Sequence, residues 1–288
     1  MQFANHHAHT SFSDGKGTPE KYLDEAIKQG LHTYGFSDHA PIPVDGYGLM
    51  EMDALPEYLS TIGQLREHYH GFIQIYKSLE VDYIPGIINV NSEHVAQAGL
   101  DYTIGAVHSI GFLPNGKPWG FESSPSHFKF GVETLFGGDV RAAVTRYFEL
   151  VREMVLQHCP DIVAHVERIR IINKGGRFFN PRDKWYQDQL YKTLKTIARS
   201  GAILEINTKG IVQENRKDVF PSLSTIAHAY ELGMLIHLSS DAHHPKMITR
   251  HFEHASQALR HIGCKSTIVM MDGRWQEMPL KEASAVAF

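Results

Sequence analysis

His7 and His9 lie one residue apart near the start of the chain, in the stretch Asn5-His6-His7-Ala8-His9. Side chains two positions apart in an extended strand point to the same side, so the two imidazoles would lie next to each other. Neutral imidazole is the commonest protein ligand for metal ions, and Asp14, in the polar turn that follows, adds a carboxylate. The spacing fits a chelating pair at a strand end, and equally a histidine-rich stretch without a function.

Further residues that can bind metal ions lie near or just after the ends of the other expected strands: His39, Glu80, His108, His165, Asp241 and His243. In a parallel α/β barrel the carboxyl ends of all strands lie on one face, which carries the active site. Any one of these histidines alone fits an ordinary hydrogen-bonded side chain, but the whole set on one rim indicates a metal centre. The set exceeds the four ligands of one tetrahedral zinc site and suits two or three ions with a bridging carboxylate.

Strands and helices alternate along the chain, as the hydrophobic pattern and the turn residues indicate. Strands are expected at the opening His-x-His stretch and over residues 31–36, 72–81, 102–107, 161–164, 202–206 and 234–239. Helices are expected over residues 19–29, 53–69, 92–99, 139–158, 183–199, 222–232 and 251–261, with a closing apolar run at 266–271. The alternation predicts a parallel sheet with helical crossovers, and this number of units favours a closed barrel formed by one domain, residues 1–288.

The segment from about residue 109 to 138 is rich in glycine, proline and aromatic residues and shows no clear periodicity. We expect a long loop there, and loops of this length inside a compact domain are usually functional lids or insertions. The stretch after Gly273 carries no structural signal.

The composition is that of an ordinary globular protein, with 288 residues, 42% of them hydrophobic, and 28 basic against 32 acidic side chains. A formal net charge of -4 disfavours a nucleic-acid or membrane-surface binder, which usually carries a basic face. Two cysteines, Cys159 and Cys264, are too few for a disulfide framework and suit a reducing compartment. With no apolar run long enough for a membrane span and no signal-peptide pattern, we expect a cytoplasmic protein.

The ordered set of motifs resembles that of the polymerase and histidinol phosphatase (PHP) superfamily of metal-dependent phosphoesterases. It runs from H-x-H-T-x-x-S-D-G at residues 7–15 to S-S-D-A-H at 239–243. Between them lie D-H at 38–39, L-E-V-D at 79–82, G-A-V-H-S at 105–109 and A-H at 164–165. The resemblance implies a distorted (β/α)7 barrel, similar to a TIM barrel, with the metal site at the carboxyl-terminal rim of the strands. Chain length, Asp14 and E-I-N-T at 205–208 look closest to the stand-alone L-histidinol-phosphate phosphatases.

The resemblance also implies a centre of three divalent ions. One would be held by His7, His9, Glu80 and Asp241, a second by Glu80, His108 and His165, and the third by Asp14, His39 and His243. Water shared between two ions becomes hydroxide near neutral pH and attacks phosphorus in line, with Asp241 placed to orient it or to move a proton. Imidazole and carboxylate ligands suit zinc, manganese or iron.

A small phosphorylated substrate also needs cationic donors, and arginine binds two phosphate oxygens at once. Arg170, five residues past His165, and Arg216, after the sixth strand, are candidates, with a solvated surface charge as the alternative for each. His244 is a third candidate substrate contact. The chain departs from the family here: the turn after Asn207 reads T-K-G-I-V where relatives often have an arginine, and His244 stands where arginine is common.

Several functions remain open at this stage. The preferred one is a histidinol-phosphate phosphatase of histidine biosynthesis, and the alternative is a related phosphoesterase acting on another small phosphate ester, a nucleotide or a nucleic-acid end. An amidohydrolase barrel also uses a His-x-His pair and a distal aspartate, but it typically bridges its ions with lysine, whereas the third strand here offers Glu80. A purely structural metal site closes its coordination, which a large ligand set on an open rim does not fit.

Overall fold

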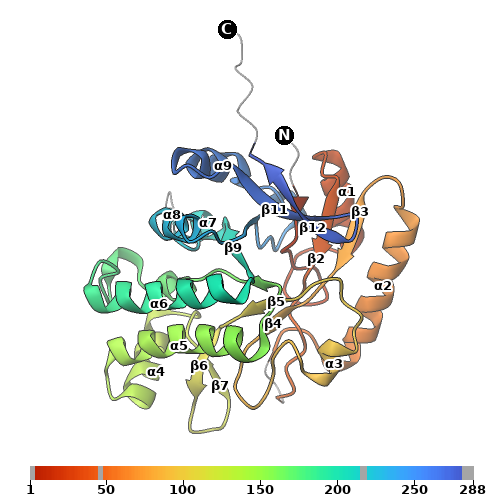
Figure 1. Ribbon diagram of the computed structural model, residues 1–288. Coiled ribbons are helices and arrows are strands. Elements are labelled where there is room, and N and C mark those ends of the chain that lie inside the picture. The colour runs from red at the N-terminus through yellow and green to blue at the C-terminus, as the bar shows by residue number, and fades with distance from the viewer. Residues whose placement is uncertain (1–3, 45–47, 215–218, 281–288) are drawn as a thin grey trace.

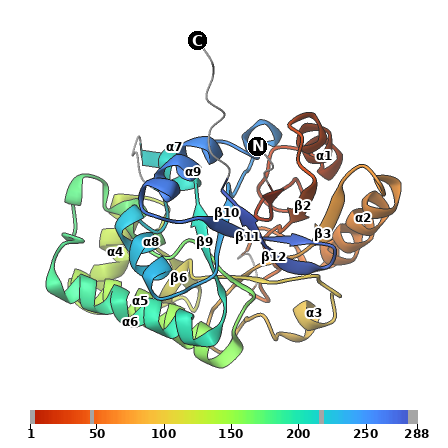
Figure 2. The ribbon, with the colours of Figure 1, turned by 45° about the horizontal axis from the view of Figure 1, so that its top comes forward.

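The computed structural model describes residues 4–44, 48–214 and 219–280. It has an α/β fold in which two parallel sheets lie in the interior and helices lie on the outside (Figures 1 and 2). One sheet has the order β1 (Ala4–Asn5), β2 (Thr33–Phe36), β3 (Gln74–Lys77). The other has the order β10 (Ile236–Ser239), β9 (Ile203–Asn207), β8 (Ile162–Val163), β5 (Ile104–Ala106), β4 (Glu80–Asp82). Every pairing in both sheets is parallel, as the alternation of strands and helices predicts.

Two isolated parallel bridges join the two sheets, and both lie beside predicted metal-binding residues. Ala8 pairs with Ala242 just after β1 and β10, and His39 pairs with Glu80 at the start of β4. The amide of His9 donates a hydrogen bond to the carbonyl of Ala242 at 2.9 Å. The bridges therefore bring together strand ends that are far apart in the sequence.

The strand expected over residues 72–81 is divided between the two sheets, so the expectation of one continuous strand was wrong. The amide of Ser78 still donates to Phe36 in the first sheet, while the carbonyl of Leu79 already accepts from Ile104 in the second. The apolar pattern reports that this stretch is buried, but it carries no information on which neighbour each residue pairs with. The switch places Glu80 at the boundary between the sheets.

Helices begin within two residues of the expected positions throughout the predicted set. They are α1 (Pro19–Lys28), α2 (Leu55–His68), α3 (Glu93–Ala96), α5 (Val140–His158), α6 (Lys184–Ser200), α8 (Leu223–Glu231) and α9 (Phe252–His261). Local signals explain the bounds: the Asp139 carboxylate accepts from the Ala142 amide at 2.9 Å to cap α5, and Gly201, with φ 79°, ends α6. In the part of the chain that the structure describes, no helix is long and apolar enough to cross a membrane.

The segment 109–138 is not a loop, contrary to the prediction. It forms an antiparallel hairpin of β6 (Ser109–Phe112) and β7 (Pro118–Gly120), followed by α4 (Pro125–Phe136). The Ser124 hydroxyl accepts from the His127 amide at 3.1 Å and caps α4, and Gly137 ends it with φ 59°. The strands are too short to show a period, whereas the cap residues at both ends of α4 are visible in the sequence.

Two further elements complete the chain. The closing run at 266–271 is β11 (Ser266–Met271), which pairs antiparallel with β12 (Arg274–Pro279), in the stretch that carries no sequence signal. Thr33, at the start of β2, donates from its hydroxyl to the Met270 carbonyl at 2.8 Å, so this hairpin packs at the amino-terminal ends of the strands. A short helix, α7 (Lys209–Glu214), directly follows β9.

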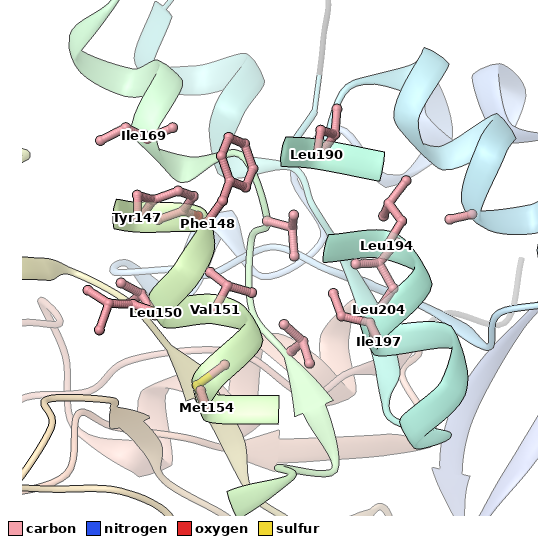
Figure 3. Close-up of a cluster of buried hydrophobic side chains, with 14 of the residues drawn as sticks. Tyr147, Phe148, Leu150, Val151, Met154, Ile169, Leu190, Leu194, Ile197 and Leu204 are labelled. Atoms are coloured by element: carbon pink, nitrogen blue, oxygen red, sulfur yellow. The ribbon is translucent and has the colours of Figure 1, made fainter. Parts of the chain in front are cut away.

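The largest apolar cluster lies between two long helices and the second sheet (Figure 3). Tyr147, Phe148, Val151 and Met154 of α5 face Leu190, Leu194 and Ile197 of α6, and Leu204 of β9 belongs to the same cluster. All of these side chains are buried. This packing fixes the sheet whose strand ends carry the candidate site.

The packing of α4 gives a stability prediction. Gly131 lies against the buried indole of Trp119, and a Cβ at position 131 would overlap that ring. Gly131→Ala is therefore expected to lower the free energy of unfolding by about 1–3 kcal/mol, because the ring or the helix must move. Urea denaturation followed by circular dichroism measures it.

Gly63 in α2 is the matched control, because a Cβ there would meet nothing within 4 Å. Gly63→Ala should raise the free energy of unfolding by about 0.5–1 kcal/mol through helix propensity alone. Equal effects of the two substitutions would contradict the packing argument.

Candidate metal centre

The structure brings all the predicted metal-binding residues together. Their ligand atoms form groups within 4.8 Å of one another, each of which could hold a metal ion: His9, Asp14, His39 and His243; His7, His9 and Asp241; Glu80, His108 and His165. A further group combines His39 and His108 with Asp82, which sequence reasoning did not select. The residues of these groups follow strands of both sheets, so the cluster depends on the complete fold.

Glu80 lies at the middle of the cluster and is 2% exposed. Its Oε1 lies 2.8 Å from His165 Nε2 and 3.7 Å from His108 Nε2. Its Oε2 faces the other side, 3.2 Å from His39 Nδ1 and 3.4 Å from His9 Nε2. Burial alone would raise the pKa of this carboxyl, but the surrounding histidines hold it well below its usual range. Glu80 can therefore bridge two positive centres.

His7 and His9 lie beside each other, with their Nε2 atoms 3.2 Å apart, as their spacing predicts. His9 Nε2 is also 3.1 Å from Asp241 Oδ1. Asp241 follows β10 and has φ 48°, a left-handed conformation that aspartate tolerates better than most residues. The two imidazoles and this carboxylate converge on one point, which is the arrangement a metal ion requires.

Asp14 and His243 meet at the outer edge of the cluster. His243 Nε2 lies 3.0 Å from Asp14 Oδ2, and His39 Nε2 lies 4.0 Å from Asp14 Oδ1. The turn that presents Asp14 is tight: a Cβ at Gly15 would overlap the carbonyl of His9. Asp38, buried beneath it, accepts hydrogen bonds from the Thr10 amide at 2.7 Å and from the Ser13 hydroxyl at 2.6 Å.

His108 and His165 form the third part of the cluster, with their Nε2 atoms 3.3 Å apart. Asp82 Oδ1 lies 2.8 Å from His108 Nδ1, which leaves Nε2 of that ring pointing at Glu80. Burial lowers the pKa of His108 and the neighbouring carboxylates raise it, to about 9, with Asp82 the strongest of them. A carboxylate on the far nitrogen fixes the orientation of a metal-binding histidine and makes it a better ligand.

Glu205 contacts two histidines of the cluster, His7 and His165. It is fully buried in β9; its Oε1 lies 2.5 Å from His7 Nδ1, and its Oε2 accepts from the His165 amide at 2.7 Å. Burial would raise the pKa of Glu205, and the adjacent His7 lowers it to about 2. The sequence offered a signal, since Glu205 opens the E-I-N-T motif, but the motif alone assigns it no partner.

The donor set fits a divalent ion. The ring nitrogens His9 Nδ1 and His165 Nδ1 are buried and make no hydrogen bond with the described residues. His7 and His108 each turn Nδ1 towards a carboxylate and Nε2 towards the cluster, so Nε2 of the neutral ring offers its lone pair to a metal ion there. Mixed imidazole and carboxylate ligands suit zinc, manganese or iron.

A cavity of about 420 Å³ opens beside the cluster. Asp14, His39, His108 and His243 line one side of it, together with Asp82, Glu122, Arg168 and Lys209, and Ile42 and Leu49 add an apolar wall. A second hollow of about 690 Å³ lies around Phe72 and Asp272, at the other end of the strands. Among the described residues, none of the predicted metal ligands lines that second hollow.

Arg168 lies on the cavity wall between two carboxylates. Its Nε and Nη2 donate to Oε1 and Oε2 of Glu122 at 2.8 and 2.7 Å, and its Nη1 lies 3.4 Å from Asp241 Oδ2. Burial raises the pKa of Glu122, and Arg168 and His108 together lower it to about 2. The bidentate pair fixes the guanidinium beside the metal-binding groups.

Of the predicted substrate-binding residues, the two that the structure describes, Arg170 and His244, do not line this cavity. Arg170 is buried, with Nη1 3.6 Å from Glu167 Oε2, and Arg168 lines the cavity instead. Both belong to a 3₁₀ helix (Arg168–Ile172), in which residues two apart point to different sides. His244 Nδ1 accepts from the Lys246 amide at 3.2 Å, and His244 is not among the cavity-lining residues described. Arg216 lies outside the described residues.

Comparison with known proteins identifies relatives along nearly the whole chain. A protein named "Probable histidinol-phosphatase" from Deinococcus radiodurans is 28% identical over 262 residues, which cover 89% of this chain and 92% of that protein. The "Histidinol-phosphatase" of Bacillus subtilis is 25% identical and covers 84% of this chain and 94% of its own.

The fold also matches a solved structure. The histidinol phosphate phosphatase of Lactococcus lactis, crystallised with zinc, L-histidinol and phosphate, superposes with a TM-score of 0.69 at 20% identity, over 95% of this chain and 98% of that one. At this identity the similarity shows the α/β fold. The family model of the PHP domain matches residues 5–209, which confirms the resemblance seen in the motifs. The chain therefore belongs to the PHP domain family.

Proposed function

We propose that the protein is a metal-dependent phosphomonoesterase that hydrolyses L-histidinol phosphate to L-histidinol and phosphate. The observation that carries this proposal is the cluster of histidines and carboxylates around Glu80, open to a cavity with Arg168 on its wall. The names of the curated relatives, and the zinc, L-histidinol and phosphate in the Lactococcus lactis structure, support the same substrate.

We further propose two or three divalent ions as the cofactor. Their ligands are His7, His9, Asp14, His39, Glu80, His108, His165, Asp241 and His243, and the separation of their atoms into groups supports three positions. The two bridges between the sheets support a distorted (β/α)7 barrel, in which β3 and β4 occupy one strand position. Because the bridges join the first sheet to the second, they also support a single domain. Zinc is favoured because it is the ion named in the Lactococcus lactis structure.

The side chains around the cluster have separate tasks in this reaction. Divalent ions bound there lower the pKa of water and neutralise charge on phosphoryl oxygens. Arg168, held by Glu122, binds the phosphoryl group with its remaining guanidinium hydrogens and balances its charge. Asp241, 3.1 Å from His9 and 3.4 Å from Arg168, is placed to orient the attacking water or to accept its proton.

The apolar part of the cavity wall supports histidinol phosphate over a sugar phosphate. Histidinol carries an imidazole ring, and Ile42 and Leu49 offer an apolar surface for it. A sugar phosphate has no aromatic ring to place against these side chains.

A phosphatase assay on the zinc-loaded protein tests this function. L-Histidinol phosphate is compared with sugar phosphates and nucleotides, and we expect its kcat/KM to be the highest of the panel. His108→Asn should abolish the activity, because it removes a group 3.7 Å from Glu80 Oε1 that also pairs with Asp82. Metal-dependent hydrolysis of the panel without this preference would keep the phosphoesterase class and overturn the substrate.

A further inference from the structure

We infer that Lys209 is a phosphate-binding residue of this site and, with Arg168, supplies the positive charge that relatives often obtain from an arginine after this strand. The inference rests on the proposed phosphomonoesterase function. It adds to the phosphate-binding site a lysine that is not among the residues selected from the sequence. It concerns the residue that follows E-I-N-T, at the first position of α7.

Lys209 lies on the cavity wall, and its side chain is 17% exposed. Its Nζ is 3.1 Å from Asp241 Oδ1, 3.1 Å from His243 Nε2 and 3.3 Å from His243 Nδ1. The ammonium is thus nearly equidistant from the two nitrogens of one ring, so it is not aligned with the in-plane lone pair of either. It lies at the inner edge of the cavity, next to two predicted metal ligands.

Asp241 is flanked by cations on both sides. Lys209 approaches its Oδ1, and Arg168 approaches its Oδ2 at 3.4 Å. Lys209 and Arg168 also line the same cavity. A phosphoryl group beside Asp241 therefore meets an ammonium on one side and a guanidinium on the other, which matches its spread of negative charge.

Hydrogen bonds hold the backbone around Lys209, so the base of its side chain has a defined position beside the cavity. The amide of Lys209 donates to Asn207 Oδ1 at 2.9 Å, and Asn207 Nδ2 in turn lies 3.3 Å from Asp241 Oδ2. The preceding Thr208 donates from its hydroxyl to the Arg250 carbonyl at 2.9 Å. A flexible lysine side chain on a rigid base can move from Asp241 to a substrate oxygen without moving the chain.

A metal ion held by Asp241 and His243 would need the lone pairs of Asp241 Oδ1, which Lys209 contacts at 3.1 Å. Two cations cannot share them, because they repel each other in a partly buried site. The ammonium must then turn towards the cavity, where an anionic substrate neutralises it. The alternative is that Lys209 only neutralises Asp241, and the two roles predict different effects of removing its charge.

The test measures the binding of inorganic phosphate to zinc-loaded protein by calorimetry, together with the kinetics on L-histidinol phosphate. Lys209→Met removes the charge and keeps the length of the side chain. We expect the Kd for phosphate and the KM for substrate to rise about tenfold or more, the effect of losing one hydrogen bond to a charged group. Lys209→Arg, which keeps a cation, should restore most of the affinity.

Lys246→Met is the matched control, because Lys246 is exposed and its side chain does not line the cavity. It should leave phosphate binding unchanged. Zinc content and melting temperature are measured on every variant, so that loss of ions or of folding is recognised.

The outcomes separate the two roles. Unchanged phosphate binding in fully loaded Lys209→Met, or an equal loss in Lys246→Met, would overturn the inference and leave Lys209 as a partner of Asp241 alone. Phosphate binding that depends on Lys209, in a protein that does not hydrolyse L-histidinol phosphate, would support the inference and overturn the proposed substrate.

Discussion

Glu80→Gln is expected to lower kcat on L-histidinol phosphate by at least about a thousandfold, because stabilisation of phosphoryl charge by bound ions is worth several kcal/mol. Glu80 Oε1 faces His165 at 2.8 Å and Oε2 faces His39 at 3.2 Å, so each oxygen serves a different group of predicted ligands. Glutamine keeps one oxygen and places an NH2 group on the other side, where its hydrogens oppose a positive ion. The side chain at position 80 therefore loses its ability to bridge two metal ions.

The measurement combines steady-state kinetics with metal analysis of the purified protein. We expect Glu80→Gln to bind at least one ion fewer than the unmodified chain and to remain folded, since glutamine has nearly the same volume; loss of the ion should lower its melting temperature in zinc. Glu57→Gln, at an exposed position in the first turn of α2, is the matched control and should change neither quantity. Full metal content together with wild-type kcat in Glu80→Gln would refute the bridging role.

The sequence was informative about the residues that come directly after strands. His108 and His165 each end a buried apolar run, and His39 comes three residues after the end of β2; parallel strands bring such positions to one edge whatever the details of pairing. This is why every predicted metal-binding residue lies in one cluster, although the strand before Glu80 is divided between two sheets. The wrong expectation of one continuous strand over residues 72–81 therefore did not affect the prediction that Glu80 lies with the other ligands.

The substrate side of the site was harder to predict, because it depends on directions that spacing does not give. Arg170 and Arg168 differ by two positions in a 3₁₀ helix, and only the structure tells which of them faces the cavity. Glu122 follows the hairpin of β6 and β7, whose strands are too short to show a period. Lys209 carries no signal in the sequence, and only the structure shows that it contacts Asp241. These contacts join residues far apart in the sequence, so no local pattern reports them.

Glu205 shows the same limit and gives the second large prediction. Its Oε1 lies 2.5 Å from His7 Nδ1 and also accepts from the Ser239 hydroxyl, while Oε2 accepts from the His165 amide at 2.7 Å and from Asn207 Nδ2 at 3.1 Å. A glutamine at this position turns one acceptor into a donor, so at least one of these donors loses its partner. Glu205→Gln is therefore expected to lower metal affinity by up to about 100-fold, the effect typical of losing a carboxylate behind a metal-binding histidine.

The buried Glu167 provides a matched control for Glu205. Glu167 is 1% exposed and accepts from the hydroxyls of Tyr186 at 2.8 Å and Thr225 at 2.7 Å. Glu167→Gln should cost about 1–3 kcal/mol of folding free energy, as Glu205→Gln does, because each leaves a buried donor unpaired. Zinc affinity, measured by competition with a chelator, should fall only in Glu205→Gln.

Excess zinc distinguishes a residue that positions a ligand from a ligand itself. If Glu205 acts by orienting His7, saturating zinc should recover most of the kcat of Glu205→Gln, since His7, His9 and Asp241 are all still present. Glu80→Gln should not recover under the same conditions, because the bridging oxygen is missing at any zinc concentration. Recovery of both variants, or of neither, would show that the two carboxylates do not have the separate roles that their contacts imply.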